Sequence, residues 1–423
     1  MSAFTITGAR VLDPASGHDA VADVVVADGL VQSIGRQTSG KASGETVDAG
    51  GYLLVPGLVD LRVSTGEPGE EHRETLATCS RAALRGGVTT AVLAPKTQPV
   101  IDDQSLVEYL LRRGRELPVN ILVAGALTKG LEGRELCELG LMRDAGAVMF
   151  ANGSQPVTDS QLLRRILQYA AHMGVLVAHP PVEPSLRACA HESEFSSRLG
   201  LPGEPGLSER IAALRDLVLA EDTGARLLLD IVSSAATLEP LRAAKARGTR
   251  VAATTTINHL ALNELDIGDY RTFAKLDPPL RGEADRLALL AAVADGTIDA
   301  VVSDHDPQPS GRKRLPFAEA APGAIGVELM LPVATTLAAD GHIDLMDMLS
   351  AMTHRPADLL GLPSGRIAEG APADLVLVDP DAPWVCDSEQ LASLAKNTPF
   401  DDRRMTGRVK RVWVAGEEAD LAG

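Results

Sequence analysis

The two ends of the chain alternate apolar and polar residues with a period of two, which is the pattern of half-buried β-strands. Near the N-terminus the pattern runs through FTITGARVLD at 4–13 and DVVVADGLVQSIG at 23–35. Asp28-Gly29 interrupts the second stretch and predicts a two-residue hairpin turn. ADLVLVDP at 373–380 and RVKRVWVAGEEA at 408–419 repeat the pattern near the C-terminus. We therefore predict that residues 1–52 and 367–423 form one small composite β-sandwich domain.

Between the two ends, short apolar runs alternate with stretches of helical periodicity. The apolar runs are TTAVLAP (89–95), VNILVAGAL (119–127), AGAVMFAN (145–152), GVLVAHPP (174–181), ARLLLDIVSS (225–234), TRVAATTT (249–256) and DAVVSDH (299–305). Helical stretches include 161–173, 207–224 and 238–248. Strand, loop and helix repeated about eight times predict an α/β fold, a (β/α)8 TIM barrel over residues 53–366. A doubly wound open sheet is the alternative, but no GxGxxG follows the first strand to favour it.

The composition fits this fold and narrows the classes of partner. Aromatic residues make up only 3% of the chain and apolar residues 45%, so Ala, Val, Leu and Ile must build the core, as in layered parallel strands. The formal net charge of −17 repels phosphate backbones and anionic lipid surfaces. We therefore expect no nucleic-acid partner and no membrane partner.

The cysteines and the N-terminal segment indicate a reducing compartment. No two cysteines form a CxxC pair, so we expect buried free thiols. MSAFTITGARVLDP has no basic region followed by an apolar stretch, and no apolar run approaches the roughly 18 residues that span a bilayer. We expect a cytoplasmic protein. The cysteines are Cys79, Cys137, Cys189 and Cys386.

In a (β/α)8 barrel, the residues that follow each strand surround the functional face. The residues to examine are therefore those just after each apolar run. They are Arg62, Ser64, Lys96, Asn152, His179, Ile231, Asn258, His259, Asp277 and the segment 304–308.

Several long segments resemble dihydroorotases, with allantoinases and hydantoinases as more distant relatives. The opening segment is VPGLVDLRVSTGEPGEEHRETLATCSRAALRGGVTTAVLAPKTQPVIDD at 55–103. ESEFSSRLGLPGEP, AKLDPPLRGEADR, DGTIDAVVSDHDP, APGAIGVELMLP, GRIAEGAPADLVLVDP and KNTPFDDRRMTGRVKRVWVAGE follow in order. The resemblance covers essentially the whole chain. It implies an amidohydrolase barrel that, in relatives, opens or closes cyclic amides with one or two Zn²⁺ ions.

The first metal-binding motif of these relatives is altered in this chain. The resemblance implies a His-x-His within DxHxHxREPG, but residues 60–69 are DLRVSTGEPG. Arg62 and Ser64 therefore stand where two histidines are expected. A guanidinium is always charged and has no lone pair to donate, so it cannot bind Zn²⁺.

The remaining implied ligand positions are mostly altered as well. The bridging position of relatives falls on Asn152, and the second of two later histidines falls on Ile231. His179 and Asp304 match a histidine ligand and the last ligand, whose carboxylate also shuttles the proton. Two side chains do not complete a zinc site, which needs at least three. We therefore expect no metal cofactor.

The positions that the resemblance assigns to substrate binding are altered in parallel. The arginine that grips the substrate carboxylate falls on Gly66, and the asparagine of the PNTNP motif falls on Lys96. The asparagine before PPLR is Asp277, and the second histidine of DHAPH is Gln308. No substrate contact is expected to be intact.

Three hypotheses concern the residues that remain. First, Arg62 fills the vacated metal space and pairs with Asp304, assisted by Lys96. Second, His179 is either a ligand remnant or a histidine satisfied within the barrel, and His259 and His305 line the old pocket. Third, the basic segment SGRKRLPF at 310–317 is a solvated loop, or alternatively a contact patch for an acidic partner.

Two functions from different classes follow, with a third as the remainder. The first is a non-catalytic dihydroorotase-like subunit of pyrimidine biosynthesis, a scaffold for aspartate transcarbamoylase and itself a homo-oligomer; the partner comes from the resemblance alone. The second is a working cyclic-amide hydrolase with a reduced or relocated zinc site built on His179 and Asp304, with His259 or His305 as a further ligand. The third is a protein that binds a small ligand in the barrel without turnover.

Overall fold

The computed structural model describes residues 3–35 and 44–421. Its centre is a parallel sheet with strand order β15-β14-β13-β10-β9-β8-β7-β6. The first and last strands meet at their C-terminal ends, where Val63 and His305 form a parallel bridge. The fold is thus the predicted TIM barrel. Its strands are β6 (Leu58–Val63), β7 (Val88–Leu93), β8 (Asn120–Ala126), β9 (Met149–Ala151), β10 (Leu176–His179), β13 (Arg226–Leu229), β14 (Val251–Thr256) and β15 (Ala300–Val302).

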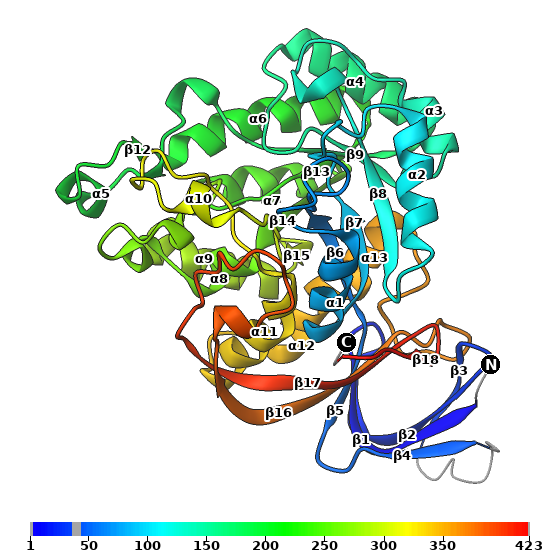
Figure 1. Cartoon of the computed structure of the whole chain (residues 1–423). Helices are drawn as coiled ribbons and strands as arrows, with labels where there is room; N and C mark the ends of the chain where they lie inside the picture. Colours follow the sequence, from blue (N-terminus) through cyan, green and yellow to red (C-terminus); the bar gives the residue numbers. More distant parts are fainter. Residues whose placement is uncertain (1–2, 36–43, 422–423) are drawn as a thin grey trace.

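Helices surround this barrel, as Figure 1 shows. Asp159 caps the start of α4 by accepting from two backbone N–H groups, and Gly174 ends it in the left-handed conformation. The predicted helices at 161–173, 207–224 and 238–248 correspond to α4, α6 and α7. The helices are α1 (Leu76–Arg85), α2 (Gln104–Gly114), α3 (Leu139–Asp144), α4 (Ser160–Met173), α5 (Glu194–Arg198), α6 (Gly206–Thr223), α7 (Leu238–Ala246), α8 (Ile257–Ala261), α9 (Glu283–Ala294), α10 (Ser310–Lys313), α11 (Met330–Ala339), α12 (Leu345–Met352) and α13 (His354–Leu360).

Strands from both ends of the chain form a second, mixed sheet with the order β18-β17-β16-β5-β1-β2-β3, in which β4 also pairs with β1. Figure 1 places this sheet at one end of the barrel, with both termini beside it. Asp28 and Gly29 both have positive φ, which is the predicted two-residue turn. The strands of this mixed sheet are β1 (Phe4–Asp13), β2 (His18–Ala27), β3 (Leu30–Gly35), β4 (Glu45–Asp48), β5 (Leu53–Pro56), β16 (Leu375–Val385), β17 (Arg404–Val414) and β18 (Glu417–Glu418). The proposed domain limits, 1–52 with 367–423 and 53–366, stay a prediction.

Small aliphatic side chains fill the barrel interior, as the low aromatic content predicts. The fully buried layers of the interior contain Val59, Val92, Ala124, Ala178 and Leu228. The closed barrel brings the C-terminal ends of its strands close together. Polar residues just beyond the strands therefore converge on one opening, the mouth of the barrel. No helix within the described ranges is long and apolar enough to cross a membrane.

Candidate functional site

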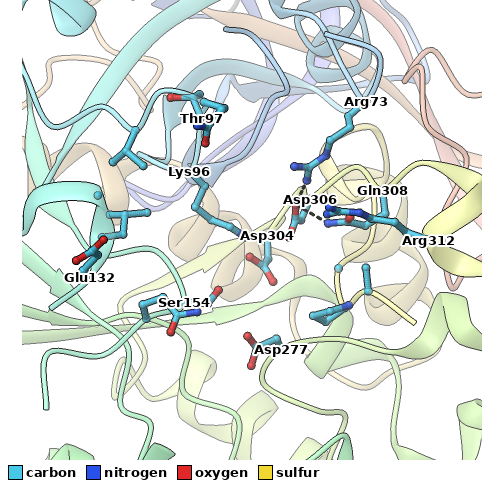
Figure 2. A pocket seen from close by; sticks show the side chains of 18 of the residues that line it. Arg73, Lys96, Thr97, Glu132, Ser154, Asp277, Asp304, Asp306, Gln308 and Arg312 are labelled. Atoms are coloured by element: carbon cyan, nitrogen blue, oxygen red, sulfur yellow. Dashed lines mark hydrogen bonds and ion pairs between the residues drawn. The ribbon is translucent and has the colours of Figure 1, made fainter. Parts of the chain in front are cut away.

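The C-terminal ends of the barrel strands surround a cavity of about 590 Å³. Its lining includes Lys96, Asp277, Asp304, Asp306 and Gln308, which come from three separate segments of the chain. Figure 2 shows these side chains directed into one space. The tertiary structure therefore brings part of the positions selected from strand ends to this cavity, while Ser64, His179 and His259 do not line it.

Arg62 lies at the end of β6 and is buried beneath this mouth. Its Nε donates to Asp304 Oδ1 at 2.7 Å, and its Nη1 donates to Asp230. The remaining nitrogen, Nη2, lies 3.2 Å from the hydroxyl of Ser154. The predicted pairing of Arg62 with Asp304 is confirmed. Asp230 was missed, although a carboxylate directly after the strand RLLL could have indicated it.

Electrostatics in the mouth follow from these pairs. Burial opposes the charge of Arg62, but the carboxylates of Asp230 and Asp304 outweigh it and raise the pKa of Arg62. Burial raises the pKa of Asp304 to about 6, although the charge of Arg62 opposes this shift. The guanidinium thus supplies positive charge between two carboxylates that follow β13 and β15, two strands separated only by β14.

Lys96 assists the Arg62–Asp304 pair only indirectly, because its ammonium group pairs with Asp306 and not with Asp304. Its Nζ lies 2.9 Å from Asp306 Oδ2, and Arg73 donates to the other oxygen of Asp306 at 2.9 Å. Figure 2 shows Arg73 directed toward Asp306. Burial acts to raise the pKa of Asp306, but these two charges outweigh it and hold that pKa below its usual value. Lys96 acts on Asp304 only through its field.

His179 is fully buried at the end of β10, and both of its ring nitrogens have partners. Nε2 accepts from the backbone N–H of Val157 at 2.8 Å, which leaves the ring proton on Nδ1. Nδ1 lies 2.6 Å from Asp216, whose other oxygen accepts from Arg215. His179 therefore has no free lone pair in this arrangement, and the interpretation as a satisfied barrel histidine fits.

Asn152 and Ile231 stand at two further positions that hold metal ligands in relatives, and neither offers a free ligand atom. Asn152 accepts from Thr128 through Oδ1 and donates to the carbonyl of Gln155 through Nδ2. Ile231 is buried hydrocarbon with φ +67°, a conformation that is strained for a β-branched residue. Asp304 has φ +48° at the corresponding strand end. Both positions have a backbone with positive φ, but only Asp304 has a side-chain oxygen that could bind a metal ion.

These donors do not fit the zinc that the barrel family implies. A charged guanidinium lies between the carboxylates, and the buried imidazole has both nitrogens occupied. In residues 3–35 and 44–421, no three or more His, Cys, Asp or Glu side chains are grouped so as to hold a metal ion. The chemistry of these side chains, including their hydrogen-bond partners, is what argues against a metal site.

The positions expected to contact substrate are occupied by internal contacts. A Cβ on Gly66 would lie 1.9 Å from the carbonyl oxygen of Glu70, so no side chain fits there without a backbone shift. Asp277 pairs with Arg187, and Gln308 donates to Asp306 at 3.1 Å. The loss at Gly66 is therefore built into the backbone of this loop.

Of three further strand-end residues, the two histidines form hydrogen bonds around the mouth. His259 Nδ1 lies 2.7 Å from the Thr256 hydroxyl, and burial lowers the pKa of His259 to about 4. His305 accepts from the backbone N–H of Gly326. Asn258 is buried, and neither atom of its amide has a hydrogen-bond partner among the described residues. None of these contacts joins the three side chains into one reactive group.

The basic segment 310–317 is not simply a solvated loop. It begins with the short helix α10, and Lys313 is buried with Nζ 3.1 Å from the carbonyl oxygen of Thr272. Burial lowers the pKa of Lys313 to about 7. Arg312 stays exposed beside the cavity. The solvated-loop expectation was wrong for Lys313 because the neighbouring segment folds over it.

Comparisons with known proteins agree with the architecture. The model of the Amidohydrolase family matches residues 53–419. Dihydroorotase from Pelobacter propionicus is 39% identical over 414 residues, covering 97% of this chain and 98% of that protein. Dihydroorotase from Pelotomaculum thermopropionicum is 38% identical over 405 residues and covers 95% of each chain. The structure of an L-hydantoinase (dihydropyrimidinase) from Arthrobacter aurescens superposes with a TM-score of 0.89 at 26% identity, over 99% of this chain and 96% of that one. This chain therefore belongs to the amidohydrolase family, within its dihydroorotase branch.

Proposed function

We propose that this protein is a non-catalytic dihydroorotase-like subunit of pyrimidine synthesis that assembles with aspartate transcarbamoylase. The observation that carries the first part is the buried guanidinium of Arg62 between Asp304 and Asp230. A metal-dependent hydrolase needs a cation there that polarises a carbonyl and generates hydroxide. Arginine supplies positive charge but has no coordination site for a water molecule, so it cannot generate the hydroxide.

The substrate positions support the same proposal. Productive binding requires groups that remain free to hold the substrate in a reactive orientation. Lys96 and Gln308 instead hold Asp306, and Arg187 holds Asp277. Gly66 has no room for a longer side chain. A mouth whose charges satisfy one another fits a subunit kept for assembly better than one kept for turnover.

The partner is proposed from the family resemblance, because dihydroorotase-like chains without activity serve relatives as scaffolds for the preceding enzyme of the pathway. A test is to co-express this chain with the aspartate transcarbamoylase of the same organism. We expect the two to co-purify, and transcarbamoylase activity to fall when this chain is omitted. Separate purification of the two, with full transcarbamoylase activity alone, would refute the assembly.

The alternative function is a working hydrolase with a reduced zinc site. Measuring zinc content and dihydroorotate turnover on the same preparation distinguishes it from the non-catalytic proposal. Dihydroorotase from Pelobacter propionicus is a suitable positive control, since it is 39% identical over nearly the full length. We expect no stoichiometric zinc and no turnover above the background. Zinc near one per chain together with turnover would overturn the non-catalytic proposal.

A further inference from the structure

A separate cavity lies between the barrel helices and the mixed sheet of the chain ends. Its volume is about 540 Å³, which is within the range of sites that hold small molecules. Its walls come from α1, the turn before α11, α11 itself, β16, β17 and the segment after β16, and Figure 1 shows β16 and β17 running beside α11. Of the described residues, none that lines this cavity also lines the mouth cavity.

Arg408 is a cation of this cavity whose charge is not neutralised. It is exposed on β17, and its guanidinium carbon lies 4.6 Å from the centre of the Trp384 ring. That ring is fixed in turn, because its indole N–H donates to the carbonyl oxygen of Gly407 at 3.0 Å. Asp379 lies opposite Arg408 in the backbone pairing, yet neither it nor any other described carboxylate forms an ion pair with Arg408. Stacking therefore holds the guanidinium in place and leaves it without a counter-ion.

The carboxylates that line the same cavity already have donors. Glu328 accepts from a backbone N–H at 2.6 Å and lies 3.6 Å from Arg85. Asp387 accepts from a backbone N–H at 3.0 Å and from the side-chain amide of Gln390 at 2.7 Å. A cationic ligand would find no free partner there, whereas an anion would find Arg408. The cavity is therefore suited to an anion.

The remaining walls and the overall charge decide what kind of anion fits. Most of the other lining is aliphatic, so the ligand carries an apolar group beside its charge. A polyanion is disfavoured by the net charge of −17 and by the two acidic side chains in the cavity. A single carboxylate on a short apolar group meets both conditions. The aliphatic lining residues are Pro332, Val385, Leu391, Val409 and Leu421.

We propose that this cavity binds a carboxylate borne by a short apolar group, with Arg408 as its anchor. A guanidinium stacked on an aromatic ring keeps the N–H groups of its outer edge free, and a carboxylate can accept two of them side by side. Because Trp384 already holds Arg408, little side-chain freedom is lost on binding. The same chemistry is offered by a free carboxylic acid and by the C-terminal residue of a peptide.

Calorimetric titration of the full chain with two matched pairs of probes tests this site. The first pair is hexanoate and hexanamide, and the second is N-acetylglycylleucine and its C-terminal amide. We expect the carboxylate to bind at least about tenfold more tightly than its neutral amide, because charge-assisted hydrogen bonds are the stronger kind. Binding of hexanoate assigns the site to a free acid, and binding of the peptide alone assigns it to a chain end. If neither carboxylate binds, or if the amides bind equally well, the proposal is overturned.

A charge-removing variant tests the role of Arg408. Arg408→Gln should weaken carboxylate binding at least about tenfold, because a polar side chain remains but its charge is gone. Arg404→Gln is the matched control, since Arg404 is exposed on the same strand, forms no ion pair with a described residue and lies outside this cavity. Thermal unfolding of both variants verifies that they fold. Unchanged affinity in a folded Arg408→Gln variant would contradict the assignment.

Fluorescence locates the bound carboxylate. The chain has two tryptophans, Trp384 and Trp413, and Trp413 is buried. A carboxylate on Arg408 should change the emission of Trp384, and this change should be absent in Trp384→Phe. A change that persists in Trp384→Phe would place the ligand elsewhere and overturn the proposal. Because no transcarbamoylase is present in these titrations, their failure is distinct from failure of the scaffold function.

Discussion

At the scale of single residues, the barrel mouth shows how one cation can hold several carboxylates in a folded protein. The planar fork of Arg62 reaches Asp304 with one nitrogen and Asp230 with another. Both carboxylates lie just after strands that are far from Arg62 in sequence, and both are largely shielded from water. A buried carboxylate without a counter-charge is costly, so the arginine is needed by the fold even where no reaction takes place.

Replacing Arg62 by methionine should therefore destabilise the protein strongly. We expect a loss of about 3–5 kcal/mol in the free energy of unfolding, because two carboxylates lose their buried partner. Urea unfolding followed by circular dichroism measures this loss. Arg10→Met is the control, since the Arg10–Asp19 pair is exposed and should contribute under about 1 kcal/mol. Equal effects of the two changes would show that the mouth does not depend on Arg62.

Asp60 predicts a specific dependence of stability on pH. Burial raises the pKa of Asp60 to about 6 from a usual value near 4. Between these values the native state holds a proton that the unfolded chain has lost, so stability falls as pH rises. Relative to the wild type, Asp60→Asn should gain up to about 3 kcal/mol between pH 4 and pH 7. Unfolding free energies measured at both pH values test this, and a difference that does not change with pH would contradict it.

At the scale of elements, helix packing around the barrel depends on a few close approaches of the backbone. Gly86 ends α1, and a Cβ there would lie 2.0 Å from the carbonyl oxygen of Val327. That carbonyl belongs to the short helical turn Val327–Leu329 before α11. The absence of a side chain at Gly86 thus allows two elements more than 200 residues apart to touch.

Gly86→Ala should consequently lower stability by about 1–3 kcal/mol, because the backbone of one element must move. Gly311→Ala is the matched control, since nothing lies within 4 Å of a Cβ added in α10. That control should change stability by less than about 1 kcal/mol, in the favourable direction. Thermal unfolding of both variants measures the contrast, and a neutral Gly86→Ala would show that α1 can shift freely.

At the scale of the whole molecule, apolar layers rather than an ion hold the barrel and the terminal sheet. The barrel interior, the layer beneath the helices and the core around Phe4 and Trp413 are each buried apolar clusters. The carboxylates at the mouth already have protein cations as partners. Stability should not require a metal.

Treatment with a chelator should therefore leave the melting temperature unchanged. Calorimetry of the protein before and after dialysis against a chelator measures this, with an added-zinc sample as the control. A fall of several degrees that zinc reverses would reveal a bound ion with a structural role.

The local sequence alone determined which segments form strands, turns and helices. It also determined which kinds of side chain stand at the ends of the barrel strands. The alternation at the termini, the Asp28-Gly29 turn and the helix over 161–173 rest on neighbouring residues, and all appear in the structure. That Arg62 and Ile231 cannot donate a lone pair to a metal follows from their side chains in any fold. Only the tertiary structure decided that Arg62 also holds Asp230, that Lys96 holds Asp306, and that Gly66 has no room for a side chain. Asp230 and Asp306 come from other strands and loops than Arg62 and Lys96, so these pairs meet only when the barrel closes, whereas Gly66 is crowded by the backbone of its own loop.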